Sequence, residues 1–172
     1  INEHAAKISK GQKWIKRVVA EMGGKNAIIV DSSANIKKAA QGIANSAFTF
    51  QGQKCSACSR AIVMSDVYDE LVDAVVEEAK KLKADQGAGR DNAAIGPVIN
   101  QNAYNNITSY IEVGRKEGTI VYGGTYSDEK GYFVDPTVIR DIKRDARIAN
   151  EEIFGPVLAV IKVDSFDEAL DI

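Results

Sequence analysis

Hydrophobic positions along the chain switch between runs typical of buried strands and spacings typical of amphipathic helices. Short apolar, β-branched runs predict strands at 27–30, 61–64, 119–122, 134–139 and 157–163. Apolar side chains recur every three or four residues between them, which predicts helices with one buried face over 36–48, 68–82 and 100–117. Strands that alternate with helices of this length indicate an α/β fold, with a sheet at least partly parallel and helices on both faces.

Single polar residues and glycines predict where several of these elements begin and end. Asp66 is predicted to cap the helix that starts at 68, because its carboxylate can accept from a free amide of the first turn. Gly118 is predicted to end the helix over 100–117, at a position that requires a positive φ angle. A polar loop that contains glycine is expected over 84–96.

The last residues suggest that the chain is part of a longer protein. Ser165 and Glu168 match the S-x-x-E capping box, which satisfies the first free amides of a helix. The sequence ends at Ile172, about one turn later, and an isolated helix of that length is unstable in water. We therefore expect a fragment.

Composition excludes several classes of protein. The chain has 22 Lys+Arg, 24 Asp+Glu and no run of five like charges, so it lacks the basic surface of a nucleic-acid or membrane-surface binder. It has no apolar run long enough to span a membrane and no signal peptide, which indicates a cytoplasmic protein, or a mitochondrial one if a transit peptide precedes it. The single histidine, His4, allows no His-rich metal site and no Ser-His-Asp triad.

Cys55 is the first candidate for chemistry, because it follows a predicted helix that Gly52 breaks. A loop between helix and strand can hold a thiol at the rim of a cleft, and Lys54 or loop amides could lower its pKa from about 8.5. The alternative is a small buried hydrophobic side chain. A redox pair with Cys58 is disfavoured, since thioredoxin-like pairs begin a helix after a strand.

Two acidic segments are further candidates. Glu21 stands in an apolar stretch before Gly23 and Gly24. Apolar surroundings would raise the pKa of its carboxyl toward the range of a general base, and paired glycines allow close approach of backbone to a ligand. Residues 151–156 combine two acids, an aromatic ring and a Gly-Pro turn. For each segment alone, a solvent-exposed acid is an equally ordinary interpretation.

Taken together and in this order, these segments closely resemble three motifs of the aldehyde dehydrogenase superfamily. AEMGGKNA (20–27) resembles the glutamate signature, FTFQGQKC (48–55) the cysteine signature and EIFGP (152–156) the E-x-F-G-P segment. The spacing of the motifs is also similar to that of the family. The resemblance continues through GYFVDPT (131–137) to the last residue, so it covers essentially the whole chain.

The resemblance implies a role for each candidate residue. Cys55 would be the nucleophile that attacks an aldehyde, after which a hydride passes to NAD, or to NADP, and a thioester remains. Glu21 would deprotonate the water that hydrolyses this thioester. Glu152 would accept hydrogen bonds from the nicotinamide ribose, and Phe154 would pack beside the nicotinamide. The Cys55 amide would form half of an oxyanion hole, completed by an asparagine from before Ile1. No metal is implied.

The resemblance also implies a domain organisation and a substrate. Residues 1–24 would be the tail of an NAD(P)-binding domain, and residues 25–172 a catalytic domain truncated at its C-terminal end. The full-length protein would be a homo-oligomer that acts on a small-molecule aldehyde, whereas the isolated chain would be inactive. Residues 53–60 and 130–137 look most like the 1-pyrroline-5-carboxylate dehydrogenases, which oxidise glutamate γ-semialdehyde to glutamate in proline degradation.

Three alternatives to this assignment stay open. Within the superfamily, a general aldehyde dehydrogenase and a succinate-semialdehyde dehydrogenase share most of the same residues. From another class, the chain could be a non-catalytic fragment with an assembly role only. Equal labelling of Cys55 and Cys58 by iodoacetamide would favour that reading, because neither thiol would then be activated.

Overall fold

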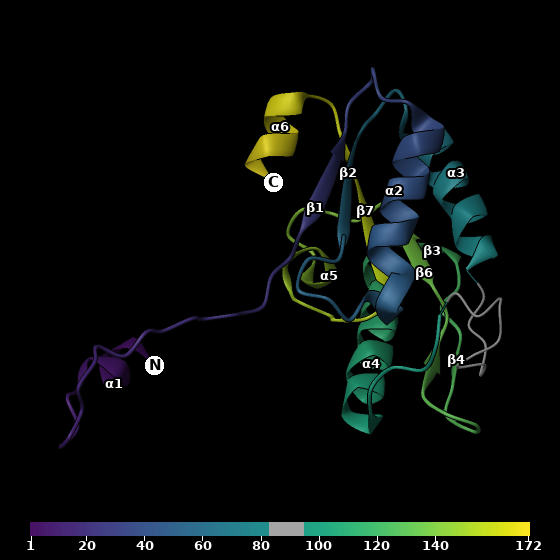
Figure 1. The fold of residues 1–172 in the computed structure, drawn as a ribbon. Coiled ribbons are helices and arrows are strands. Elements are labelled where there is room, and N and C mark those ends of the chain that lie inside the picture. The colour runs from purple at the N-terminus through teal and green to yellow at the C-terminus, as the bar shows by residue number, and fades with distance from the viewer. Residues whose placement is uncertain (83–94) are drawn as a thin grey trace.

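The computed structural model describes residues 1–82 and 95–172 and has a mostly parallel sheet at its centre (Figure 1). Five strands of the described residues form this sheet in the order β1-β2-β7-β6-β3. Neighbouring strands are parallel except β3, which pairs antiparallel with β6 at one edge. Their bounds are Ala27–Val30 (β1), Arg60–Met64 (β2), Thr119–Tyr122 (β3), Thr137–Arg140 (β6) and Val157–Val163 (β7). The predicted α/β fold is confirmed.

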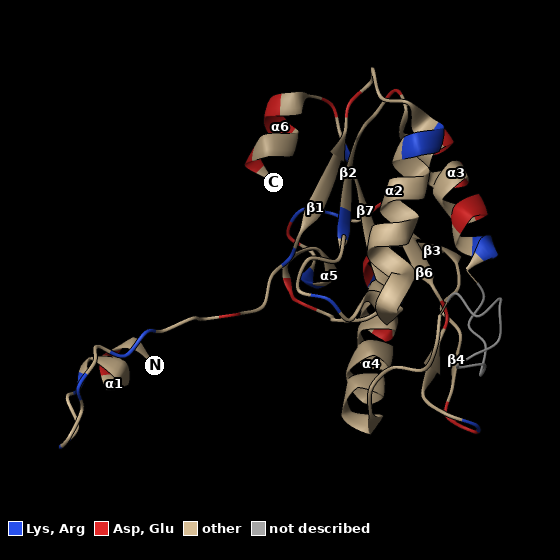
Figure 2. Ribbon diagram, viewed as in Figure 1, with Lys and Arg blue, Asp and Glu red and all other residues tan. Residues whose placement is uncertain are grey.

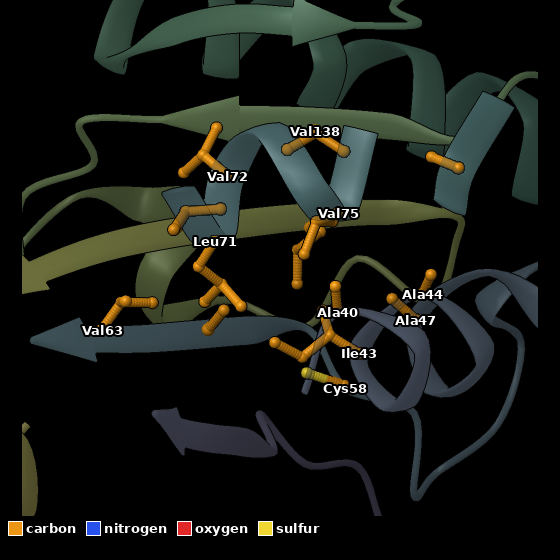
Figure 3. Packing of buried hydrophobic residues seen from close by; sticks show 14 of the residues in the cluster. Ala40, Ile43, Ala44, Ala47, Cys58, Val63, Leu71, Val72, Val75 and Val138 are labelled. Atoms are coloured by element: carbon orange, nitrogen blue, oxygen red, sulfur yellow. The ribbon is translucent and has the colours of Figure 1, made fainter. Parts of the chain in front are cut away.

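Helices cover both faces of the sheet. On one face α2 (Ile36–Phe48) and α3 (Tyr68–Lys81) pack on Val63 and Val160, and Figure 3 shows the alanines of α2 facing the valines and Leu71 of α3. On the other face α4 (Gln101–Glu117) packs on Ile62 and Ile161. The shorter helices α5 (Arg147–Asn150) and α6 (Phe166–Asp171) belong to the same apolar cluster as α4. Successive residues of β2 therefore serve opposite faces, as the two-residue period of a strand requires.

Residues 1–26 form an arm that leads away from the sheet and carries the short helix α1 (Asn2–Ala6) (Figure 1). Several large apolar side chains of the arm are exposed: Ile1, Ile8, Trp14, Ile15, Val19 and Met22. The sheet begins at Ala27. Assignment of residues 1–24 to a cofactor domain stays a prediction.

The prediction of one continuous strand over 134–139 is wrong. Phe133–Val134 (β5) pairs with Tyr126–Ser127 (β4) in a separate two-stranded ribbon, and β6 begins only at Thr137. Pro136 lies between the two strands and has no N–H to donate to a ladder, which explains the break.

The start of α3 and the end of α4 do not depend on the interactions predicted from the sequence. Asp66 does not cap α3, because its carboxylate accepts from the Ser32 hydroxyl at 2.8 Å instead. Gly118 ends α4 with extended backbone at φ −160°, not with a positive φ. A Cβ at Gly118 would overlap the side chain of Ile142 and the carbonyl oxygen of Arg140, so close packing against the strand requires glycine there.

The predicted cap of α6 is confirmed, since Ser165 Oγ accepts from the Glu168 amide at 3.1 Å. Most of the predicted loop 84–96 lies outside the described residues.

Figure 2 shows charges of both signs on α3, where Glu77 and Glu78 pair with Lys80 and Lys81, whereas most of α2 is uncharged. Within residues 1–82 and 95–172, no helix combines the length and the apolar composition needed to cross a membrane.

Candidate active site

Strand order brings together three segments that are far apart in the sequence, at the N-terminal ends of neighbouring strands of the sheet. The arm precedes β1, the cysteine loop precedes β2, and the loop from Glu151 to Pro156 precedes β7. Because β1, β2 and β7 are parallel neighbours, the segments that enter them meet at the same edge. A narrow cleft there, of about 20 Å³, is lined by Gly24, Cys55, Glu152 and Phe154 among others.

Asn26 holds the cysteine loop in place. Its side-chain amide donates to the carbonyl oxygen of Cys55, and its own carbonyl oxygen accepts from the amides of Ser59 and Arg60, both at 3.2 Å. The thiol-bearing residue is exposed, and within the described part of the chain its backbone N–H has no acceptor. Cys55 can therefore meet a ligand with both its thiol and its amide. The sequence alone predicts no role for Asn26.

Cys58 is a packed side chain at the inner wall of the cleft. It is buried, and burial raises the pKa of its thiol to about 11. Its amide donates to Ser46 Oγ at 3.0 Å and its Sγ donates to the Arg60 carbonyl at 3.3 Å. Both cysteines are free thiols. Lys54, predicted as a source of positive charge for the loop, directs its ammonium group to the Thr49 hydroxyl at 3.3 Å.

Glu152 and Phe154 lie on either side of Ile153 in the chain and present a carboxylate and an aromatic ring. Glu152 is exposed, and its Oε1 accepts from the Gly24 amide at 3.1 Å. Phe154 is 42% exposed and has φ +57°, in the left-handed region. A carboxylate can accept from vicinal ribose hydroxyls, and an exposed ring can pack on a planar heterocycle. Binding of the nicotinamide riboside end of NAD by this pair stays a prediction.

The cysteine loop and the Glu152 loop are in direct backbone contact at two glycines. Gly52 ends the 3₁₀ helix η1 (Thr49–Gly52) with φ +64°, and a Cβ there would overlap the carbonyl group of Gly155. Both the positive φ and the close approach require glycine. From the sequence, Gly52 is predicted only to break the helix before the cysteine loop.

Lys25 introduces a positive charge next to the cleft that sequence reasoning did not identify. Its Nζ is buried and has no hydrogen-bond partner among the described residues. Burial lowers the pKa of this ammonium group to about 8, with a further contribution from Arg60, although Glu152 and Glu151 oppose the shift. The Lys25 amine therefore interacts electrostatically with the Glu152 carboxylate of the cleft.

Glu21 is the predicted site residue that the structure does not bring to the cleft. Its side chain is exposed on the arm and is not among the residues that line the cleft. The prediction that the Glu21 carboxyl has apolar surroundings is therefore wrong. Glu21 nevertheless lies two residues before Gly23, where a Cβ would overlap the Glu152 carboxylate. Its role stays a prediction.

No metal centre is formed by the described ranges, in which no three His, Cys, Asp or Glu side chains are grouped for metal binding. The structure is an α/β domain with an exposed thiol in the loop that precedes β2. Residues 2–172 match the aldehyde dehydrogenase family model over almost the whole chain. The chain therefore belongs to the aldehyde dehydrogenase family.

Relatives in this family are similar over the full chain. It is 55% identical over 172 residues to the 1-pyrroline-5-carboxylate dehydrogenase of Geobacillus sp. (strain WCH70) and 50% identical to that of Staphylococcus aureus (strain JH1), with 100% of the chain and 33% of each relative covered. The solved structure of a Thermus 1-pyrroline-5-carboxylate dehydrogenase with bound NAD superposes with a TM-score of 0.88 at 45% identity. That match covers 99% of this chain and 33% of the Thermus chain. The chain thus spans about a third of the length of these relatives.

Proposed function

We propose that this chain carries the nucleophile and part of the cofactor site of an NAD-dependent aldehyde dehydrogenase whose substrate is glutamate γ-semialdehyde. The observation that carries the proposal is the cleft that joins Cys55, Glu152 and Phe154 from two separate loops. The names of the relatives support this substrate, which belongs to proline degradation. The activity itself would belong to a polypeptide of the relatives' length.

Cys55 performs the covalent chemistry in this proposal. Its thiolate attacks the aldehyde carbon, and its backbone N–H, which has no acceptor in the described part of the chain, donates to the oxygen of the resulting thiohemiacetal. The bound NAD supplies the acceptor for the hydride that leaves this carbon. The product on Cys55 is then a thioester, which water must hydrolyse.

The other residues bind the cofactor and complete the cycle. The Glu152 carboxylate accepts from the nicotinamide ribose hydroxyls, and the Phe154 ring packs beside the nicotinamide. Glu21 removes a proton from the water that attacks the thioester. This role requires the Glu21 carboxylate to reach Cys55, and the segment that carries Glu21 already contacts the cleft at Gly24.

The proposal also includes the domain organisation, the oligomeric state and the location of the protein. Residues 1–24 form the tail of the NAD-binding domain, residues 25–172 belong to the catalytic domain, and the full-length protein is a homo-oligomer. The relatives compared are bacterial, so we place the protein in the cytoplasm.

The test is a specificity comparison with the full-length protein that contains this sequence. Glutamate γ-semialdehyde should exceed acetaldehyde in kcat/KM by about a hundredfold or more, on the order of 3 kcal/mol of differential transition-state binding. NAD and NADP are compared in the same assay. A higher kcat/KM for succinate semialdehyde would assign that substrate instead, and equal values would indicate a general enzyme. Failure to reduce either cofactor with any aldehyde would favour an assembly role.

A further inference from the structure

The segment from Glu151 to Gly155 has no regular secondary structure, yet it must hold Glu152 and Phe154 in a defined orientation. Ile153 is buried at 3% exposure, whereas the side chains on either side of it are exposed. Phe154 adopts φ +57°, which is unfavourable for a residue with a side chain. Such a backbone conformation persists only where the surrounding structure holds it.

Three side chains of α4 provide that support from behind the segment. Asn106 Nδ2 donates to the carbonyl oxygen of Ile153 at 3.1 Å. The Tyr110 hydroxyl donates to Glu151 Oε2 at 2.7 Å. Ile107 packs so closely under Gly155 that a Cβ there would overlap its side chain. Residues 106, 107 and 110 lie within about one turn of α4, so one side of this helix contacts the start, the middle and the end of the segment.

Arg147 strengthens the contact at Glu151. Its guanidinium group donates to both oxygens of the Glu151 carboxylate, with Nη2 at 2.8 Å from Oε2, and lies over the Tyr110 ring at 5.6 Å. The hydrogen bonds from Arg147 and then Tyr110 lower the pKa of the Glu151 carboxyl, so it remains a charged acceptor at neutral pH. Glu151 is therefore held by two donors, immediately before Glu152.

We propose that Asn106 and Tyr110 are positioning residues of the cofactor site. They hold the segment from Glu151 to Gly155 so that the Glu152 carboxylate and the Phe154 ring face the nicotinamide riboside. This inference rests on the proposed function, because it assigns a role in NAD binding. Neither residue lines the cleft with Cys55, so the thiol chemistry does not depend on them directly.

The first test is Asn106→Asp in the full-length protein, which keeps the shape of the side chain but replaces the donor with an acceptor. Asn105→Asp is the matched control, because it adds the same charge one position earlier and keeps the oxygen that accepts from Gln101. We expect Asn106→Asp to raise the KM for NAD about fivefold, the typical effect of one lost hydrogen bond, with kcat within about twofold. The control should leave both constants unchanged.

The second test is Tyr110→Phe, which removes only the hydroxyl that Glu151 accepts from. Tyr126→Phe is its control, because that phenol bonds Glu112, on the same helix but away from the segment. Hydrogen exchange of the amides from 152 to 157 is measured beside the kinetics. Faster exchange in Tyr110→Phe and Asn106→Asp, with neither control affected, would show that α4 holds this segment.

The outcomes separate this inference from the proposed function. If the wild-type protein reduces NAD but neither α4 variant changes the KM for NAD, the inference is overturned and the function stands. A fall in kcat alone, or unchanged exchange over 152–157, also overturns it. If the wild-type protein neither binds nor reduces NAD, the proposed function fails and the cofactor role of α4 fails with it.

Discussion

The backbone amide of Gly24 donates a hydrogen bond to Oε1 of Glu152 at 3.1 Å, across 128 positions of sequence. Gly23 packs against the other side of the same carboxylate, where a Cβ would overlap Oε2. The segment that carries the proposed base, Glu21, is thus in contact with the proposed ribose-binding carboxylate. Space at Gly23 therefore determines where the Glu152 carboxylate can lie.

A pair of alanine substitutions tests this packing. Gly23→Ala should move the flexible, exposed Glu152 carboxylate away from the Gly24 amide and weaken NAD binding about fivefold, the typical effect of one lost hydrogen bond. Gly24→Ala is the control, since its Cβ would meet its nearest neighbour, Asn26 Oδ1, at an ordinary 3.6 Å. The measurement is the KM for NAD in the full-length protein. Equal values for the two variants would contradict the close contact at Gly23.

The buried amine of Lys25 predicts a pH-dependent stability. Its pKa of about 8 in the folded chain lies below the usual 10.5, so between these values the unfolded state binds more protons. The cost of burying the charge is fully present below about pH 8 and is relieved as the pH rises toward 10.5. We expect Lys25→Met to raise the free energy of unfolding more at pH 7 than at pH 10.

Urea unfolding at the two pH values measures this difference. Lys37→Met, at an exposed lysine, is the control and should change the free energy of unfolding little at either pH. An equal effect of Lys25→Met at both pH values would mean that Glu151 and Glu152 compensate the buried charge fully.

The two thiols should differ strongly in reactivity. Cys58 is buried and its pKa is raised to about 11, so it carries almost no thiolate at pH 8, whereas Cys55 is exposed. Iodoacetamide at pH 8 should label Cys55 and leave Cys58 unmodified until the chain is unfolded, as peptide mass spectrometry would show. Comparable labelling of Cys58 in the native chain would be inconsistent with this packing. Labelling of Cys55 no faster than glutathione would favour the non-catalytic alternative.

Much of the fold was predictable because burial leaves a periodic trace in the sequence. The helix over 36–48 and the strand over 157–163 have the predicted bounds, since the helix packs an apolar face on the sheet and the strand is a buried, central strand of it. The strand over 134–139 was predicted wrongly as continuous, because Pro136, which has no N–H, interrupts a β-rich pattern. Asp66 shows a second limit, since a distant hydroxyl, that of Ser32, competes for a capping carboxylate.

The candidate site was predicted through motifs and not through local pattern. Cys55, Glu152 and Phe154 meet because β2 and β7 are neighbours, and strand order is a long-range property that periodicity does not reveal. The hydrogen bond of Asn26 and the burial of the Lys25 ammonium group arise only in the folded chain, and nothing in their spacing distinguishes these residues from surface residues.

The central claim is that Cys55 forms the thioester and that Glu21 acts only in its hydrolysis. Glu21→Gln in the full-length protein keeps the size of the side chain but removes the base, so hydrolysis should slow by about a hundredfold or more. Rapid mixing with glutamate γ-semialdehyde and NAD should then give a burst of NADH near one per active site, followed by a slow steady rate. Cys55→Ala is the control and should give no burst.

The most direct measurement is mass spectrometry of the Glu21→Gln protein, quenched with acid immediately after the burst. The mechanism predicts an acyl group on the peptide that contains Cys55, in an amount equal to the NADH of the burst. An unmodified Cys55 after a full burst, or an acyl group on another residue, would contradict it.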